Sequence, residues 1–136
     1  MARPARRPEP DESDFEAVSR AQLARVREDV GARTLRHYAA AYLDLLPARL
    51  DRIEQAIATA DQAEATRVMF DLRSSSAMLG ARRLCALLTT LESTLRIGLP
   101  AGPAQLAVLR AEALAVSAAL RRLLGGDSLG RPRPPD

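Results

Sequence analysis

Apolar residues recur every three or four positions along much of this sequence, which is the spacing of one face of an α-helix. The longest such stretch begins at Ala32 and carries seven apolar positions: Leu35, Ala39, Tyr42, Leu46, Leu50, Ile53 and Ile57. Pro47 falls inside it. Because proline removes a backbone donor and crowds the preceding turn, we expect a kink at Pro47 in a helix that continues on both sides.

Three later stretches of the same kind predict helices over about residues 61–80, 84–98 and 106–124, and glycines mark the end of each. The connection before residue 61 is very short, so the two helices it joins should run antiparallel as a hairpin. The sequence shows no strand-like alternation and no internal repeat. This pattern predicts an all-α fold, an antiparallel up-and-down four-helix bundle with an additional N-terminal helix.

Two pairs of residues have the spacing of a capping box, in which a side chain at the helix start accepts from a backbone N–H three residues later. Asp61 with Glu64 marks the start of the third helix, and Ser13 with Glu16 marks the start of the first, which should then run to about Gly31. We therefore assign residues 13–124 to the helical bundle.

The two ends differ in composition from the middle. Residues 1–12 and 125–136 are rich in Pro, Gly and charged residues and have too little apolar surface to offset the cost of ordering, so both are expected to be disordered. The N-terminal stretch lacks the apolar segment of a secretory signal, and we expect no membrane-spanning run and a cytoplasmic location.

Composition excludes several kinds of chemistry. Arginine supplies all 20 basic residues, and the net charge of +3 is too small to favour nucleic acid, although it suits an acidic protein partner. Cys85 is the single cysteine and has no second thiol or nearby histidine, so we predict a small apolar core residue, no metal site and no cofactor.

The segment Phe70–Ala81 reads Phe-Asp-Leu-Arg-Ser-Ser-Ser-Ala-Met-Leu-Gly-Ala. It resembles the signature of histidine phosphotransfer (Hpt) domains, His-x-Leu-Lys-Gly-Ser-Ala/Ser-x-x-Leu-Gly-Ala, and the resemblance extends over about residues 19–124. Phe70 stands at the position of the phospho-accepting histidine, Arg73 replaces lysine and Ser74 replaces glycine. The resemblance implies a phosphorelay module of a two-component system that has lost its acceptor.

Helical geometry predicts that Phe70 faces away from the core. At 100° per residue, its side chain points about 160° from that of Leu72, which lies on the core face. The neighbours of Phe70 on this outer face give an apolar spot with a basic rim, which is typical of a protein-binding surface: Thr66, Arg67, Arg73, Ser74 and Ala77. The plainer interpretation of Phe70 is an ordinary solvent-exposed aromatic residue, since single exposed apolar residues are common. The plainer interpretation of the arginines is a solvated helix face, and we assign it to Arg82 and Arg83.

The leading hypothesis is a pseudo-Hpt protein that binds a response-regulator receiver domain or a histidine kinase without carrying phosphate. A phenyl ring cannot replace the nucleophilic imidazole. One alternative is an active phosphotransferase that uses His37, the only histidine. Another is a structural or dimerisation module, and the sequence leaves open a monomer or a homodimer. The serines at 74–76 have only a carboxylate nearby, which is too weak a base to activate a hydroxyl as a nucleophile. We therefore expect their hydroxyls to form hydrogen bonds at a contact between helices.

Overall fold

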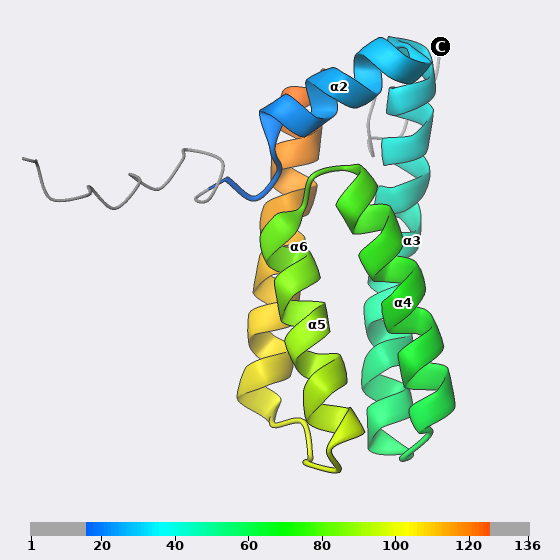
Figure 1. Cartoon of the computed structure of the whole chain (residues 1–136), viewed down its shortest axis with the longest axis vertical. Helices are drawn as coiled ribbons and strands as arrows, with labels where there is room; N and C mark the ends of the chain where they lie inside the picture. Colours follow the sequence, from blue (N-terminus) through cyan, green and yellow to red (C-terminus); the bar gives the residue numbers. More distant parts are fainter. Residues whose placement is uncertain (1–15, 126–136) are drawn as a thin grey trace, which may run out of the picture.

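A computed structural model describes residues 16–125, and in this part of the chain all regular structure is helical (Figure 1). A short helix is followed by four longer ones: α2 (Arg20–Val30), α3 (Ala32–Ala58), α4 (Gln62–Met78), α5 (Arg82–Arg96) and α6 (Pro103–Leu123). The predicted all-α fold is therefore confirmed. The boundaries proposed for disordered ends remain a prediction, because residues 1–15 and 126–136 lie outside the described part.

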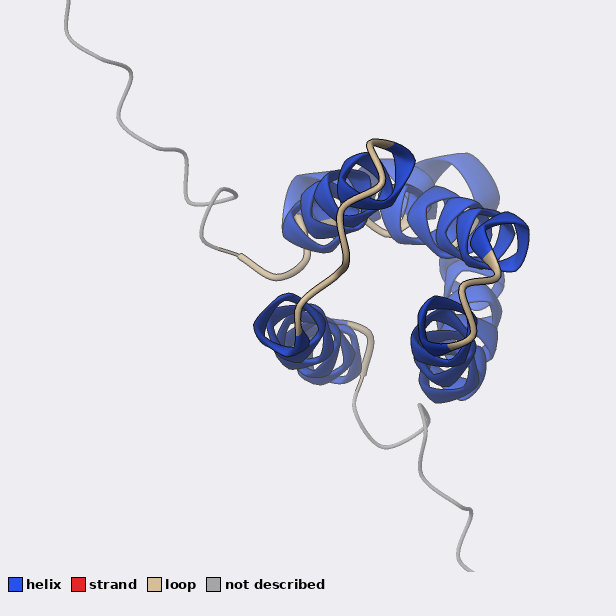
Figure 2. Cartoon of the chain, turned by 90° about the horizontal axis from the view of Figure 1, so that it is seen from below, coloured by secondary structure: helices blue, strands red, loops and turns tan. Residues whose placement is uncertain are grey.

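The four long helices form an antiparallel up-and-down bundle. Each packs against the next in the chain, and α6 returns to α3 to close the bundle. Figure 2 shows these helices end on, with α4 and α6 at opposite corners. Helix α2 lies across one end of the bundle and contacts α3 (Figure 1).

Aliphatic side chains fill the interior, as the scarcity of aromatic residues predicts. The largest fully buried side chains come from all four long helices and the segments next to them: Val18, Leu35, Ile53, Met69, Leu72, Leu79, Leu84, Leu88, Leu91, Val116 and Leu120. Each such burial contributes roughly 1.5–3 kcal/mol. Tyr42 is the aromatic residue in this core, and its hydroxyl lies 2.8 Å from the Ser76 hydroxyl. Burial raises the pKa of Tyr42 to about 12.

The predicted start of the third helix at Asp61 is confirmed. The predicted start of the first helix at Ser13 is wrong for α2. The Asp61 side chain accepts from the Glu64 backbone N–H at 3.2 Å, so Asp61 caps α4. Helix α2 begins at Arg20, and its cap is Ser19, whose hydroxyl accepts from the backbone N–H of Gln22. Ser13 lies outside the described residues, and residues 16–19 are not helical.

Tertiary contact explains where α2 begins. The Ser19 backbone N–H donates to the carbonyl of Gly80, in the turn between α4 and α5, at 3.0 Å. Val18, just before this contact, is buried in the core. The segment before α2 is thus held against the bundle at Val18 and Ser19, and the helix starts after it.

Two further expectations can be compared with the helices. Helix α3 continues through Pro47 without interruption.

Within residues 16–125, α6 has a length and mean hydropathy that would allow it to cross a membrane, which the sequence analysis did not anticipate. One face of α6 is buried in the bundle, and its Arg110 binds Asp51 and Glu54 of α3. These are the contacts of a bundle helix.

Candidate docking surface on helix α4

Phe70 lies on the outer face of α4, as the helical geometry predicts. Its side chain is 57% exposed, whereas the neighbouring Met69 and Leu72 are buried. Four residues of the predicted outer face are also exposed: Thr66, Arg67, Ser74 and Ala77. We call this set, together with Arg73, the Phe70 surface.

Arg73 is fixed between the phenyl ring and a carboxylate of the next helix. The centre of its guanidinium lies 5.8 Å from the centroid of the Phe70 ring, within the range of a cation–π contact. Its Nη1 atom also lies 2.6 Å from Oε2 of Glu92 on α5. Glu92 in turn contacts Arg96 at 3.3 Å. The guanidinium therefore has a defined position beside the ring, in place of the mobile charge expected at a solvated face.

Arg67 also has acidic partners within the chain. It forms hydrogen bonds with both carboxylate oxygens of Glu64, the shortest 2.7 Å long, and lies 3.9 Å from the carboxylate of Asp71. These bonds to Glu64 raise the pKa of Arg67 above its usual value. The rim of the Phe70 surface is consequently one of paired charges, and its positive excess is smaller than the sequence suggests.

A small groove runs between α3 and α4 beside this surface. It has a volume of about 150 Å³, and Arg67 and Asp71 form its α4 wall. Leu45, which is half exposed, and the side chains of Arg49 and Arg52 form the α3 wall. The sequence analysis missed these three residues, because they lie off the apolar stripe of α3 and only the packing of the two helices brings them into one groove with Arg67 and Asp71.

Two of the serines at 74–76 serve the helix contact. Ser76 is buried against the Tyr42 hydroxyl, and Ser75 accepts from Arg49 of α3 at 3.1 Å while donating to carbonyls of its own helix. Ser74 is exposed. The expected structural role is thus confirmed for Ser75 and Ser76. Ser74 instead belongs to the surface.

The other polar candidates lie apart from Phe70 or are inert. Tyr42 of α3 contacts Ser76, near the C-terminal end of α4, and His37 lies still further along α3 and is exposed. At 1.5 Å per residue, His37 is about 18 Å along the axis from Arg49, which lines the groove.

Cys85 is half-buried, so the prediction of a core residue was too strong, and burial raises the pKa of its thiol.

Arg83 corrects a smaller expectation, since it pairs with Glu112 of α6 at 3.2 Å and is more than part of a solvated face. Among the described residues, no group of three or more His, Cys, Asp or Glu side chains could hold a metal ion.

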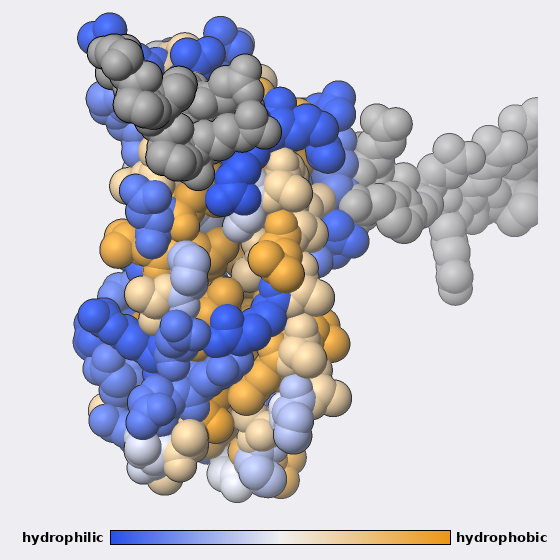
Figure 3. Space-filling model, turned by 180° about the vertical axis from the view of Figure 1, so that it is seen from behind, coloured by the Kyte–Doolittle hydropathy of each residue, from blue (hydrophilic) through white to orange (hydrophobic). Residues whose placement is uncertain are grey.

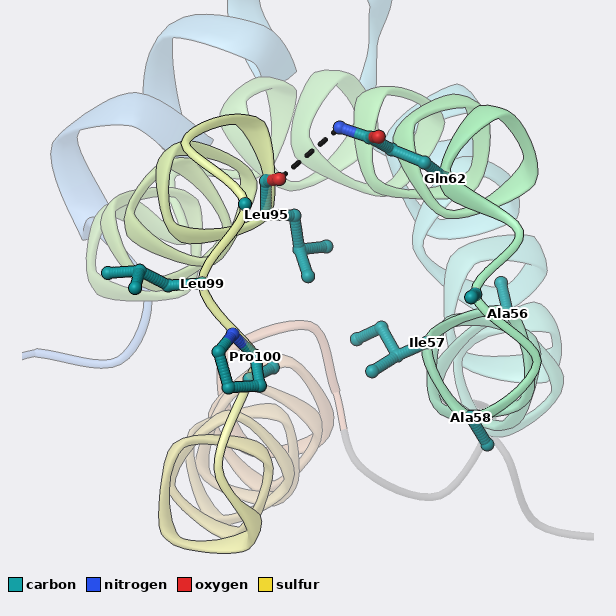
Figure 4. Close-up of a pocket in the computed structure, with 10 residues that line it drawn as sticks. Ala56, Ile57, Ala58, Gln62, Leu95, Leu99 and Pro100 are labelled. Carbon is teal, nitrogen blue, oxygen red and sulfur yellow. Dashed lines mark hydrogen bonds between the residues drawn. The ribbon is translucent and has the colours of Figure 1, made fainter.

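A larger pocket lies at the far end of the bundle, where the α3–α4 turn faces the α5–α6 loop (Figure 4). Its volume is about 530 Å³, and the Gln62 amide closes one side by donating to the Leu95 carbonyl at 3.3 Å. None of the residues lining it is ionisable or nucleophilic. It offers no chemistry, and the Phe70 surface is the stronger candidate site.

The comparisons with known proteins concern the bundle as a whole. The family model described as Hpt domain matches residues 37–123, which include nearly all of α3 and the whole of α4, α5 and α6. No curated protein and no solved structure matches the chain.

Proposed function

This chain belongs to the Hpt domain family, and we propose that within phosphorelay signalling it is a pseudo-Hpt protein that binds without carrying phosphate. Its partner is a response-regulator receiver domain or a histidine kinase of a two-component system. It acts by competition or by scaffolding, and the Phe70 surface is the part that docks.

The observation that carries the proposal is Phe70 itself, 57% exposed at the position of the motif histidine. Phosphoryl transfer to an Hpt domain needs a ring nitrogen with a lone pair, and a phenyl ring has none. The fold around the position is otherwise retained. Loss of the one reactive atom from an intact domain supports a role in binding.

The local geometry suits an interface hot spot. Aromatic residues, phenylalanine included, and arginine are enriched at the cores of protein–protein interfaces. Here Arg73 lies over one side of the Phe70 ring and is held there by Glu92, so docking would cost little additional side-chain entropy. The groove between α3 and α4, lined in part by Arg67, places a mainly charged hollow next to the rim of the Phe70 surface.

The test is binding of this chain to a panel of receiver domains and kinases from the same genome. Phe70→Ala should weaken the bound complex by about 2 kcal/mol, roughly 30-fold in Kd. Ile97→Ala is the matched control, because Ile97 is 70% exposed and lies in the α5–α6 connection, at the end of the bundle where α4 begins and outside the Phe70 surface. Equal affinity of Phe70→Ala and the unmodified chain would contradict docking through this surface.

A second measurement separates binding from transfer. Incubation with a phosphorylated receiver should leave no acid-labile phosphate on the chain. Phosphate that appears and is lost in His37→Gln would instead establish the alternative, an active phosphotransferase using His37.

A further inference from the structure

A groove with a volume of about 420 Å³ lies between the segment that precedes α2 and the C-terminal half of α6. We call it the α6 groove. Residues 16–18 line one side, and the α6 side is made mainly of small apolar residues: Ala115, Ala118 and Ala119. Three arginines from three different helices also line it: Arg20, Arg83 and Arg122. Figure 3, which views the molecule from behind, shows hydrophilic residues gathered at the upper end, where α6 ends beside the start of α2.

Positive charge is concentrated around the α6 groove. Arg122 is exposed and forms no ion pair or hydrogen bond within residues 16–125. Helix α5 begins with Arg82 and Arg83, and it has no acidic residue in its first turn and no side-chain cap. The carboxylate among the lining residues is that of Glu16, which lies 3.5 Å from Arg20. The groove therefore suits an acidic segment that also carries an apolar side chain.

The chain immediately before Glu16 has this composition. Residues 9–14 include four acids, and Phe15 follows them: Glu9, Asp11, Glu12 and Asp14. The arginines of the N-terminal stretch lie further from the groove in sequence, within residues 3–7. The order of the sequence thus places the acids and the aromatic residue next to the arginines of the α6 groove.

The tether to the groove is short and fixed. Glu16 is itself a lining residue, and Val18 and Ser19 hold the following chain against the bundle through core burial and a 3.0 Å hydrogen bond to the Gly80 carbonyl. At up to about 3.5 Å per residue, Glu12 can reach roughly 14 Å from Glu16. A segment tethered this closely has an effective concentration in the millimolar range, so even a weak contact is populated.

We propose that residues 12–15, which precede the part of the chain that the structure describes, occupy the α6 groove. The Phe15 ring packs on the alanines of α6, and the carboxylates of Glu12 and Asp14 pair with the surrounding arginines. The contact closes the basic groove to other acidic proteins and leaves the Phe70 surface, on the opposite corner of the bundle, as the accessible docking face (Figure 2). The inference rests on the α6 groove and holds even if the Phe70 surface binds nothing.

Disulfide formation in the full chain tests the placement. In a Cys85→Ala background, Ser13→Cys with Ala118→Cys should form a disulfide within one chain. Ser13→Cys with Ala104→Cys should form at least about tenfold less, because Ala104 is an equally exposed alanine about 21 Å earlier on α6. Equal linking of the two pairs, or no linking of the first, would overturn the proposal. Disulfides between chains would assign the groove to a second copy and overturn it as well.

Fluorescence tests the contact of the aromatic ring. The chain contains no tryptophan, so Phe15→Trp introduces a single fluorophore. Its emission should lie at shorter wavelength, and acrylamide should quench it less, than in Pro4→Trp. Adding Arg122→Glu should abolish the difference, whereas Arg121→Glu, exposed but outside the groove lining, should leave it unchanged, with circular dichroism confirming the helices of both. Identical emission of Phe15→Trp and Pro4→Trp, or equal effects of the two arginine variants, would contradict the proposal.

A labelled peptide that copies residues 9–16 tests whether the groove is occupied. The Glu12→Arg, Asp14→Arg double variant should bind this peptide at least about tenfold more tightly than the unmodified chain does, because its own segment no longer competes. Fluorescence anisotropy is the measurement. Equal binding to both chains, or no binding to the double variant at millimolar peptide, would show that residues 12–15 are not the occupant.

Discussion

Arg73 shows how a single side chain can fix the orientation of an exposed aromatic ring on a helix surface. The guanidinium is shared between the Phe70 ring and the Glu92 carboxylate, so two helices together fix the orientation of an exposed aromatic. Arginine suits this double role, since its planar cation can lie over a ring while its edge donates to a carboxylate. The outward direction of Phe70 follows from helical spacing alone. The partner Glu92 could not be predicted, because it depends on the register between α4 and α5.

The Phe70→His variant asks how much of the acceptor site survives. We expect the imidazole to accept phosphate from a phosphorylated receiver, because the position is exposed and Arg73 keeps a positive charge beside it. Acid-labile ³²P on the chain is the measurement, and Phe70→Gln, polar but not nucleophilic, is the control. If Phe70→His binds the receiver but stays unlabelled, the Ser74 side chain is the obstacle, and adding Ser74→Gly should restore labelling.

Tyr42 gives a pH dependence with a defined sign. Its pKa is raised from 10.0 to about 12 by burial, against the smaller opposing effect of the Ser76 hydrogen bond. Below pH 10 both folded and unfolded chains keep the phenol protonated, so this group adds no pH dependence. Between pH 10 and 12 the unfolded chain loses its proton first, and stability must fall as pH rises.

Urea unfolding of the Tyr42→Phe variant measures this contribution. The variant should lose about 1 kcal/mol at neutral pH, because the Ser76 hydroxyl is left buried without its partner. Its further loss on raising the pH to about 12 should be smaller than that of the unmodified chain by on the order of 2 kcal/mol. Tyr38→Phe, at an exposed tyrosine, should behave like the unmodified chain. Parallel curves for Tyr42→Phe and the unmodified chain would exclude the effect.

At the scale of elements, contacts between helices decide where a helix begins. The sequence offers two N-terminal caps of similar quality, and Asp61 is used while Ser13 is not the cap of α2. The difference is that Ser19 is anchored to the α4–α5 turn through the Gly80 carbonyl. Local capping patterns cannot reveal this bond, since the two residues are far apart in sequence. Gly80 of the motif is thus in close contact with the start of α2, which leaves no room for a larger residue at this position.

Gly80→Ala tests that requirement. Gly80 has a φ of 78°, and a Cβ there would lie 3.0 Å from the Cβ atoms of Ser19 and Gln22. Gly98 has a φ of 80° with nothing within 4 Å of a built Cβ, so Gly98→Ala reports the backbone strain alone. We expect a loss of about 1 kcal/mol for Gly98→Ala and roughly 2–4 kcal/mol for Gly80→Ala, from urea unfolding. Equal losses would show that α2 yields without cost.

At the scale of the whole molecule, the exposed side chains of Phe70 on α4 and Leu114 on α6 belong to helices at opposite corners of the bundle. The sequence predicts the bundle and its helix order because four long stripes with short connections leave few alternatives. The apolar spacing of α6 also predicts its buried face, which includes Leu109, Val116 and Leu120. It does not explain why Leu114, outside this spacing, is an exposed leucine on the same helix.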